Sequence, residues 1–441
     1  MSGVATKGGA RKGGAGKTSI GGRASSVGGP KPGSYAGERP KVSPAVGRRR
    51  LVLLITAVLY LFGLVMVTSA TSGTSLLNNG DQWEYLRKQL IIGGLGCVAM
   101  AIAMHIPLGL LRRLTLPLLI ASTALLLVVF VPGVGHSANG ATRWIYLGGG
   151  FQLQPSEIVK LALVIYLADH LARTPAPRHW WRDFLKSPGG VALVLAAIIF
   201  IQRDLGSAMV TGALVLVLYM LSGTNWRLLA GTVGPGIALV SIGILSEEYR
   251  RERFLAFLDP WADPHGPGYQ LVQALIAIGS GGPFGVGLGH SVQKIHFLPE
   301  AHTDMIFSIV AEELGLVGVL VVLVAFAALA IVGVRIALRA SDRFTSLVAA
   351  GLTFILCGQA TLNLAGVVGV LPLTGVPLPL VSYGGSNLLV SLTALGLLAN
   401  IAVAQHEQYD ADGPAVASGP ADSAGRSRWY RRAPGASAGS S

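Results

Sequence analysis

The segment LPEAHTDMIFSIVAEELG, residues 298–315, carries acidic side chains to the start of a long apolar run. Glu300 and Asp304 precede the run, whereas Glu312 and Glu313 lie within it. A charge at membrane depth costs about 2.5–3.5 kcal/mol on insertion scales, so it normally faces protein or water. Asp304 and Glu312 are eight residues apart and therefore lie on nearly one side of a helix. The spacing predicts a polar stripe that descends from an outward-facing cavity, although Asp304 also fits a plain solvated helix start. Glu313, about 100° away around the helix, is predicted to form a structural pair.

A second polar motif is QPSEIVK, residues 154–160. Pro155 suits the first turn of a helix, and Glu157 and Lys160 are three residues apart, which makes them neighbours on its surface. Two interpretations stay open. The two side chains form a local ion pair, or Lys160 supplies positive charge to a cavity that Asp304 also lines.

The motif NGATRWIYLGG, residues 139–149, joins an arginine to an aromatic residue. Arg143 and Trp144 are typical anchors at a membrane interface. Arg143 also has the planar guanidinium that binds a phosphate group in bidentate fashion. Both roles remain open at this stage.

The segment VLPLTGVPLPLVSYGGSN, residues 370–387, is apolar but contains three prolines and Gly375, which forbid a continuous helix. Irregular backbone at membrane depth is tolerated only against protein or a watery cavity. The helix that follows would offer free N–H groups to an anion, unless Ser386 or Asn387 caps it. The candidate binding residues here are Ser382, Tyr383, Gly384, Gly385 and Ser386.

Upstream of Asp304, the loop contains an apolar run at residues 269–278. About ten residues are too few to span a bilayer, so we expect an interfacial or re-entrant helix. Further along the loop, Glu300, His302 and Asp304 together could hold a divalent ion such as Mg²⁺ or Mn²⁺.

These motifs lie between runs that are long and apolar enough for membrane helices. Of the 441 residues, 51% are hydrophobic and 12% are charged, about half the charge of a soluble domain. We predict an all-α polytopic membrane protein with ten transmembrane helices, because only helices or closed barrels satisfy their backbone in lipid. The ten runs are residues 51–70, 86–104, 114–131, 156–172, 189–202, 205–222, 227–246, 305–334, 345–368 and 387–405.

Lysine and arginine placement predicts the orientation of these helices. A basic arm, residues 1–48, precedes the first run, and basic clusters recur in alternate loops. Both termini are therefore expected in the cytoplasm, with a large extracytoplasmic loop, residues 247–304, between the seventh and eighth spans. The ten-helix domain covers residues 49–406, and the arm and the tail, residues 407–441, are expected to be disordered. The net charge of +13 comes largely from the arm, which favours contact with membrane lipid rather than nucleic acid.

Several motifs together resemble the SEDS family of bacterial ten-span proteins of division, elongation and sporulation. They are GPGYQ, GGPFGVGLGHSVQKIHFLPEAHTD, AEELGLVG, QPSEIVK and PLTGVPLPLVSYGGSN, and the likeness covers roughly residues 50–405. LPEAHTD looks more like the division members than the elongation members. In QRDLG, residues 202–206, Arg203 stands where the family commonly has proline, which bears on the shape of that loop.

The resemblance implies a peptidoglycan glycosyltransferase that polymerises lipid II at the outer face of the cytoplasmic membrane. It also implies a class B penicillin-binding transpeptidase and other divisome membrane proteins as partners. The essential acid of the family corresponds to Asp304, the lysine of its fourth span to Lys160, and the arginine of its GA-x-RW pattern to Arg143. Asp304 is then the expected general base, while Lys160, Arg143, the last helix start or a divalent cation would stabilise the pyrophosphate leaving group.

The remaining candidate residues fall into two groups. Expected substrate or pyrophosphate contacts also include Glu157, Glu300 and His302, and expected cavity residues are Gln202, Asp204, Gln293, Lys294 and Glu312. Three other functions compete with septal synthesis: a lipid II flippase, a non-catalytic divisome scaffold, and an elongation polymerase. The lack of an internal repeat counts against a transporter built from duplicated halves.

Overall fold

The structure is a computed structural model that describes residues 44–138, 141–148, 151–174, 183–184, 188–245, 248–295 and 297–411. The basic arm up to residue 43 and the tail from residue 412 lie outside the described residues, so the predicted disorder of both stays a prediction.

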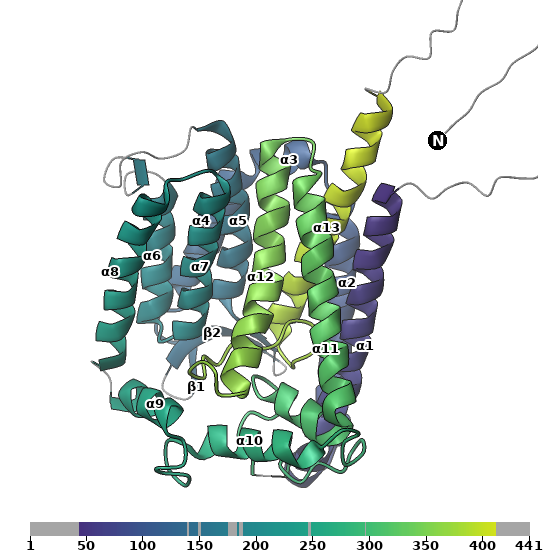
Figure 1. Ribbon diagram of the computed structural model, residues 1–441, viewed down its shortest axis with the longest axis vertical. Helices are drawn as coiled ribbons and strands as arrows, with labels where there is room; N and C mark the ends of the chain where they lie inside the picture. Colours follow the sequence, from purple (N-terminus) through teal and green to yellow (C-terminus); the bar gives the residue numbers. More distant parts are fainter. Residues whose placement is uncertain are drawn as a thin grey trace, which may run out of the picture. The chain divides into compact units, whose positions relative to one another are not determined.

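A helix forms at each of the ten predicted apolar runs (Figure 1). By length and composition, six of them could cross a membrane, and three more are apolar but shorter. The six are α1 (Pro44–Asn79), α2 (Glu84–Ala103), α8 (Trp226–Leu245), α11 (Ile306–Leu338), α12 (Arg343–Val367) and α13 (Gly385–Ala411). The three shorter helices are α4 (Thr115–Val128), α6 (Pro188–Ile201) and α7 (Leu205–Leu221). The remaining helix of the ten is α5 (Pro155–Arg173).

These helices run side by side in one bundle (Figure 1). Leu163 on α5, Leu352 on α12 and Leu395 on α13 are fully buried within it. Large apolar side chains also point outward, among them Leu95 on α2 and Ile120 on α4. An apolar exterior around a packed interior is expected of helices that face lipid.

Short elements gather at one end of the bundle (Figure 1). They include α9 (Glu248–Leu258) and α10 (Tyr269–Gly281), both within the predicted large loop. Helix α10 confirms the short helix expected at residues 269–278. The first residues of α1, the end of α13 and the short helix α3 (Leu108–Arg113) lie at the opposite end.

The all-α expectation is wrong between α4 and α5. Residues there form a three-stranded antiparallel sheet in the order β1 (Gly135–Ala138), β2 (Ala141–Gly148) and β3 (Phe151–Leu153). Thr142, Trp144, Ile145 and Tyr146 are of the β-branched and aromatic types that favour strands, which explains the sheet.

Helix α11 is interrupted, contrary to the expected continuous span. Gly315 has φ 64° and ψ −155°, a backbone conformation that only glycine adopts readily. The loop before α11 closes on this break, because the Leu316 amide donates to the Gly282 carbonyl at 3.0 Å. Residues 306–314 are therefore a separate first segment of α11, and Glu312 and Glu313 belong to it.

Candidate functional site

A cavity of about 1080 Å³ is bordered by several parts of the chain, four of which supply most of its lining residues. The sheet contributes residues of β2 and β3, and the start of α7 adds another part of the wall. The loop before α11 supplies residues 299–304. The proline-rich segment and the start of α13 supply residues 372–377 and 383–387. The cavity therefore brings together segments that are far apart in the sequence.

Asp304 lines this cavity just ahead of α11. The Thr303 hydroxyl donates to Glu300 Oε2 at 2.9 Å and lies 3.3 Å from Asp304 Oδ1. Burial and, to a lesser extent, the Glu300 carboxylate raise the pKa of Asp304 to about 6, although Arg253 opposes the shift. A carboxylate with a pKa near neutrality is suited to accept a proton at physiological pH.

Aromatic rings form the wall beside Asp304. His302 packs edge-on to Tyr85, with ring centroids 4.9 Å apart, and Tyr85 packs edge-on to Tyr383 at 5.0 Å. The backbone N–H of Tyr383 donates to the His302 carbonyl at 2.9 Å, which ties the two loops together. Burial lowers the pKa of His302 and raises that of Tyr383 to about 12, so both rings are uncharged near pH 7.

Arg143 lies on β2 at another part of the cavity. Its guanidinium stacks over Trp144 at 4.2 Å and approaches Asp204 Oδ1 at 3.8 Å. Its Nε is buried and has no hydrogen-bond partner among the described residues. A buried unpaired donor is unfavourable, so an anionic ligand that accepts from it would gain binding energy.

Asp204 anchors Arg143 from the start of α7. It caps this helix by accepting from the Ser207 amide at 3.1 Å. Its other oxygen accepts from the Gln154 side chain at 2.7 Å and from the Ser156 hydroxyl at 3.2 Å. The predicted cavity residue is thus a structural support behind the wall.

Two further predicted residues also support the wall from behind. Gln202 donates to the Leu126 carbonyl at 2.8 Å and is buried. Ser382 is buried and accepts from the Leu378 amide at 2.8 Å. Neither residue is part of the cavity surface.

The start of α13 faces the cavity, as predicted. Gly384, Gly385 and Ser386 line it together with Asn387. The Ser386 hydroxyl accepts from the backbone N–H of Gln154 at 2.7 Å and bonds the Gln152 carbonyl at 3.3 Å. Ser386 therefore links α13 to the segment between β3 and α5.

Lys160 is fully buried and does not line the cavity. Its Nζ donates to Glu157 Oε1 at 2.8 Å and to Gln359 Oε1 at 3.2 Å. The local ion-pair interpretation is confirmed, whereas the expectation that Lys160 shares the cavity surface with Asp304 is wrong. Lys160 is linked to the cavity indirectly. Its partner Glu157 lies with Oε2 3.4 Å from the side-chain amide of Asn387, which lines the cavity.

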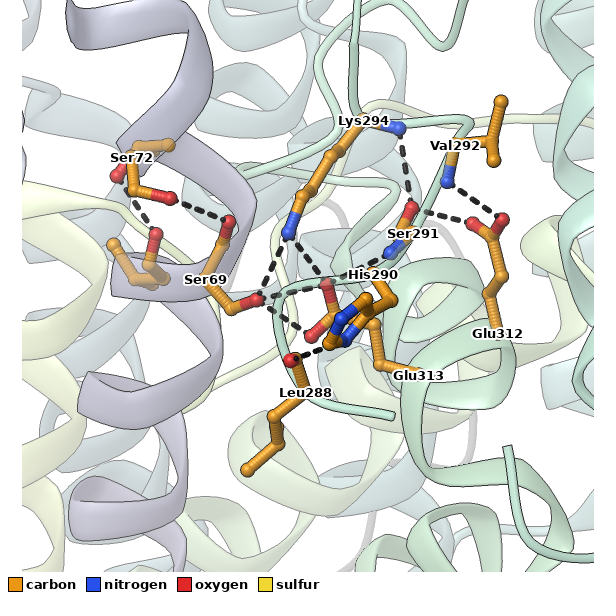
Figure 2. A network of polar contacts seen from close by, with 11 residues as sticks. Ser69, Ser72, Leu288, His290, Ser291, Val292, Lys294, Glu312 and Glu313 are labelled. Carbon is orange, nitrogen blue, oxygen red and sulfur yellow. Dashed lines mark hydrogen bonds and ion pairs between the residues drawn. The ribbon is translucent and has the colours of Figure 1, made fainter. Parts of the chain in front are cut away.

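Glu313 forms the structural pair that its position predicts (Figure 2). Lys294 Nζ donates to Glu313 Oε1 at 2.8 Å, and both side chains are buried. The Ser69 hydroxyl on α1 donates to the same carboxylate at 2.6 Å. The pair thus joins α1, the loop and the first segment of α11.

Glu312 binds the loop rather than facing the cavity (Figure 2). Its carboxylate accepts from the Ser291 hydroxyl and from the Val292 amide. The predicted polar stripe is wrong in this respect, because the break at Gly315 lets the loop fold against Glu312. Gln293, also predicted as a cavity residue, lies outside the cavity wall.

A metal site is not preassembled in the described part of the chain. No group of three or more His, Cys, Asp or Glu side chains there is arranged to hold a metal ion. Glu300, His302 and Asp304 line one cavity but do not form such a group.

Some cavity residues have no motif that marks them as part of a site. Tyr85 and Lys88 come from the start of α2, and Arg253 comes from α9. Arg253 is one of several charges in a long loop, so its sequence context resembles a solvated surface. Only the folding of α9 beneath the bundle brings it to the cavity.

A bundle of apolar helices with a carboxylate-bearing polar cavity defines a polytopic membrane protein with an enzyme-like site. The chain belongs to the FtsW/RodA/SpoVE family, whose model, described as cell cycle protein, matches residues 49–407. It is 42% identical over 357 residues to the probable peptidoglycan glycosyltransferase FtsW of Geobacter metallireducens, covering 81% of this chain and 95% of that protein. The protein of the same name from Alcanivorax borkumensis is also 42% identical, over 78% of this chain and 91% of its own.

Solved structures agree with the family assignment. One chain of a peptidoglycan synthase complex, described as coordinating polymerization and crosslinking, is 31% identical with a TM-score of 0.67, covering 82% of this chain and 98% of that one. The rod shape determining protein RodA of Thermus thermophilus is 30% identical with a TM-score of 0.59, covering 80% of this chain and 96% of that one. The matched part is the membrane domain, which includes every residue of the cavity.

Proposed function

We propose that this chain is a peptidoglycan glycosyltransferase that polymerises lipid II at the outer face of the cytoplasmic membrane during cell division. One observation carries the proposal: a single cavity presents Asp304 on one wall and Arg143 on another. The names of the FtsW relatives support the activity and its role in division over elongation.

The reaction joins two lipid-linked disaccharides. Asp304 takes the proton from the 4-hydroxyl of the acceptor GlcNAc as that oxygen attacks the anomeric carbon of the donor MurNAc. The bond from this carbon to the pyrophosphate oxygen breaks, and undecaprenyl pyrophosphate departs with the electron pair. The proton on Asp304 then passes to solvent, which restores the carboxylate.

The leaving group is an anion and needs positive charge rather than a general acid. Arg143 offers a half-buried guanidinium whose buried Nε has no partner among the described residues, and the start of α13 adds backbone N–H groups on the same cavity. Lys160 acts at a distance, because its pairing with Glu157 fixes the carboxylate that Asn387 contacts.

A divalent cation, Mg²⁺ or Mn²⁺, would fit this site only with help from the substrate. Magnesium is commonly bound by one or two carboxylates plus phosphate oxygens. Glu300 and Asp304 supply the carboxylates, and the pyrophosphate of lipid II would supply the rest. The cation would then supply positive charge to the pyrophosphate.

We also propose ten membrane spans, with both termini in the cytoplasm, residence at the septum and a class B penicillin-binding transpeptidase as partner. The ten-helix bundle supports the spans, and the FtsW relatives support the septum. A structural relative from a complex that couples polymerization to crosslinking supports a crosslinking partner.

The decisive experiment gives lipid II to the purified full-length chain, alone and with a transpeptidase partner, and analyses the glycan products. Polymer formation without another polymerase is the expected result. Transfer of lipid II across vesicles without polymer would instead indicate a flippase, and neither product would indicate a scaffold. Repeating the assay with a chelator tests the cation.

A further inference from the structure

The end of α6 has an unusual residue at a position that favours glycine. The Asp204 amide donates to the Ile199 carbonyl at 3.3 Å, and the Arg203 amide donates to the Phe200 carbonyl at 3.0 Å. This pair of bonds is the Schellman motif, in which the residue after the cap adopts a left-handed backbone. Arg203 occupies that position with φ 61°.

A left-handed backbone is unfavourable for a residue with a Cβ atom. Among the described residues, only Arg203, Glu300 and Leu380 combine a positive φ with a side chain. Arg203 and Glu300 both line the cavity. Backbone strain of this kind is concentrated at functional sites, where the side chain gives a benefit that offsets it.

Arg203 lines the same cavity as Arg143. It is exposed to the cavity, and it directly precedes Asp204, the residue that anchors Arg143. Two further cations line the cavity: Lys88, which pairs with Glu84 at 2.6 Å, and Arg253, which bonds Gln270 at 2.9 Å.

We propose that Arg203 is a substrate-affinity residue that binds the pyrophosphate of the lipid-linked substrate together with Arg143. The inference rests on the proposed function and deepens it. Glycine meets the backbone requirement at this position without strain, so an arginine there carries a conformational cost. A second guanidinium in the same cavity as Arg143 would allow both phosphates of a pyrophosphate to accept charge-assisted hydrogen bonds.

Three substitutions in the full-length chain separate the backbone from the charge. Arg203→Gly removes both the strain and the charge, Arg203→Gln removes only the charge, and Arg203→Lys keeps the charge. Thermal unfolding is measured with increasing inorganic pyrophosphate, and the apparent KM for lipid II is measured in the polymerisation assay.

Pyrophosphate is expected to raise the unfolding temperature of the wild type. The Gly and Gln variants should need about 10- to 100-fold more pyrophosphate for the same rise, as expected when a hydrogen bond to a charged group is lost. Their apparent KM should rise by a similar factor, while the Lys variant should lie closer to the wild type. Without ligand, the Gly variant should unfold at or above the wild-type temperature.

Wild-type affinity in both the Gly and Gln variants would overturn the proposal, and so would a wild type that does not respond to pyrophosphate. Should the Gly variant unfold early, the Gln variant still decides the outcome, because it keeps a side chain at residue 203. Should the wild type bind pyrophosphate but make no polymer, the proposed function would fail while the binding role of Arg203 would stand.

Discussion

At the scale of single residues, Asp304, the proposed general base, lies in a position that is energetically unfavourable for its charge. Its carboxylate is held in a site that disfavours the charged form, because burial and the Glu300 carboxylate both raise its pKa. Neutral pH nevertheless keeps most of it ionised. The residue is thus expected to favour activity at the expense of stability.

The first prediction concerns Asp304→Asn. Loss of the general base should lower kcat by about 10²- to 10⁴-fold. The same change should stabilise the fold at pH 7.5 by on the order of 2–3 kcal/mol, because it removes a carboxylate whose pKa is raised from 3.8 to about 6. Polymerisation and thermal unfolding check the two effects. Wild-type activity in this variant would refute the role of Asp304 as general base. A variant less stable than the wild type would refute the destabilising effect of its carboxylate.

The second prediction concerns pH. Asp304 acts in its deprotonated form, so kcat/KM should be constant above the pKa of about 6 and fall about tenfold per pH unit below it. The contribution of Asp304 to the free energy of unfolding should instead rise as the pH falls. The folded-state pKa lies above the unfolded value, so the folded protein binds the extra proton and gains stability as pH falls from about 6 toward 4. A kcat/KM that stays flat from pH 7 to 5 would contradict the assignment.

Residue types and short spacings predicted part of the site. The separation of Glu157 and Lys160 made their ion pair one of two interpretations, and the structure confirms it. Helical geometry alone separated Glu313 from Asp304. The partners of Glu313 were not predictable, because Lys294 lies 19 residues and Ser69 lies 244 residues away. Such contacts depend on how the elements fold together.

At the scale of elements, the pair of Lys294 and Glu313 fastens the loop that carries Asp304. It joins this loop to α1 and α11 in a buried site (Figure 2). Glu312 adds two more bonds to the same loop through Ser291 and Val292. These contacts are expected to position the cavity wall without touching substrate.

The third prediction tests this joint. Lys294→Met should destabilise the fold by about 3–5 kcal/mol, because it leaves the Glu313 carboxylate buried without its partner. The double variant with Glu313→Leu should recover much of this loss, since both charges are then gone. Thermal or denaturant unfolding of the two single variants and the double variant measures the coupling. Additive losses would show that the pair does not act as a unit.

The ten helices could be predicted because apolar length is a strong signal, whereas two other elements could not. The sheet is short and lies between apolar helices, and its motif was interpreted as an interfacial anchor or a phosphate site rather than as a strand. The break in α11 depends on Gly315 meeting the loop at Gly282, a contact that sequence periodicity does not contain. Both elements border or support the cavity, which explains why only some of its walls were predicted.

At the scale of the whole molecule, the two ends of the bundle differ. The cavity lies with α9 and α10 at one end, and the start of α1 and the end of α13 lie at the other (Figure 1). Arg112 and Arg113 on α3 lie at the end that carries the termini. Because basic residues mark the cytoplasmic side, we expect the cavity to lie outside the cell, where lipid II polymerisation would take place.

The fourth prediction tests this orientation with single cysteines. Cys97 and Cys357 are first replaced by serine, and one cysteine is then introduced at His265, between α9 and α10, or at Ser341, between α11 and α12. Both positions are exposed. In spheroplasts, a membrane-impermeant maleimide should label His265→Cys directly but Ser341→Cys only after permeabilisation. The cysteine-free parent is the control for background labelling, and polymerisation activity shows that each variant is folded. The reverse labelling pattern would place Asp304 on the cytoplasmic side, where an enzyme that uses outward-facing lipid II could not work.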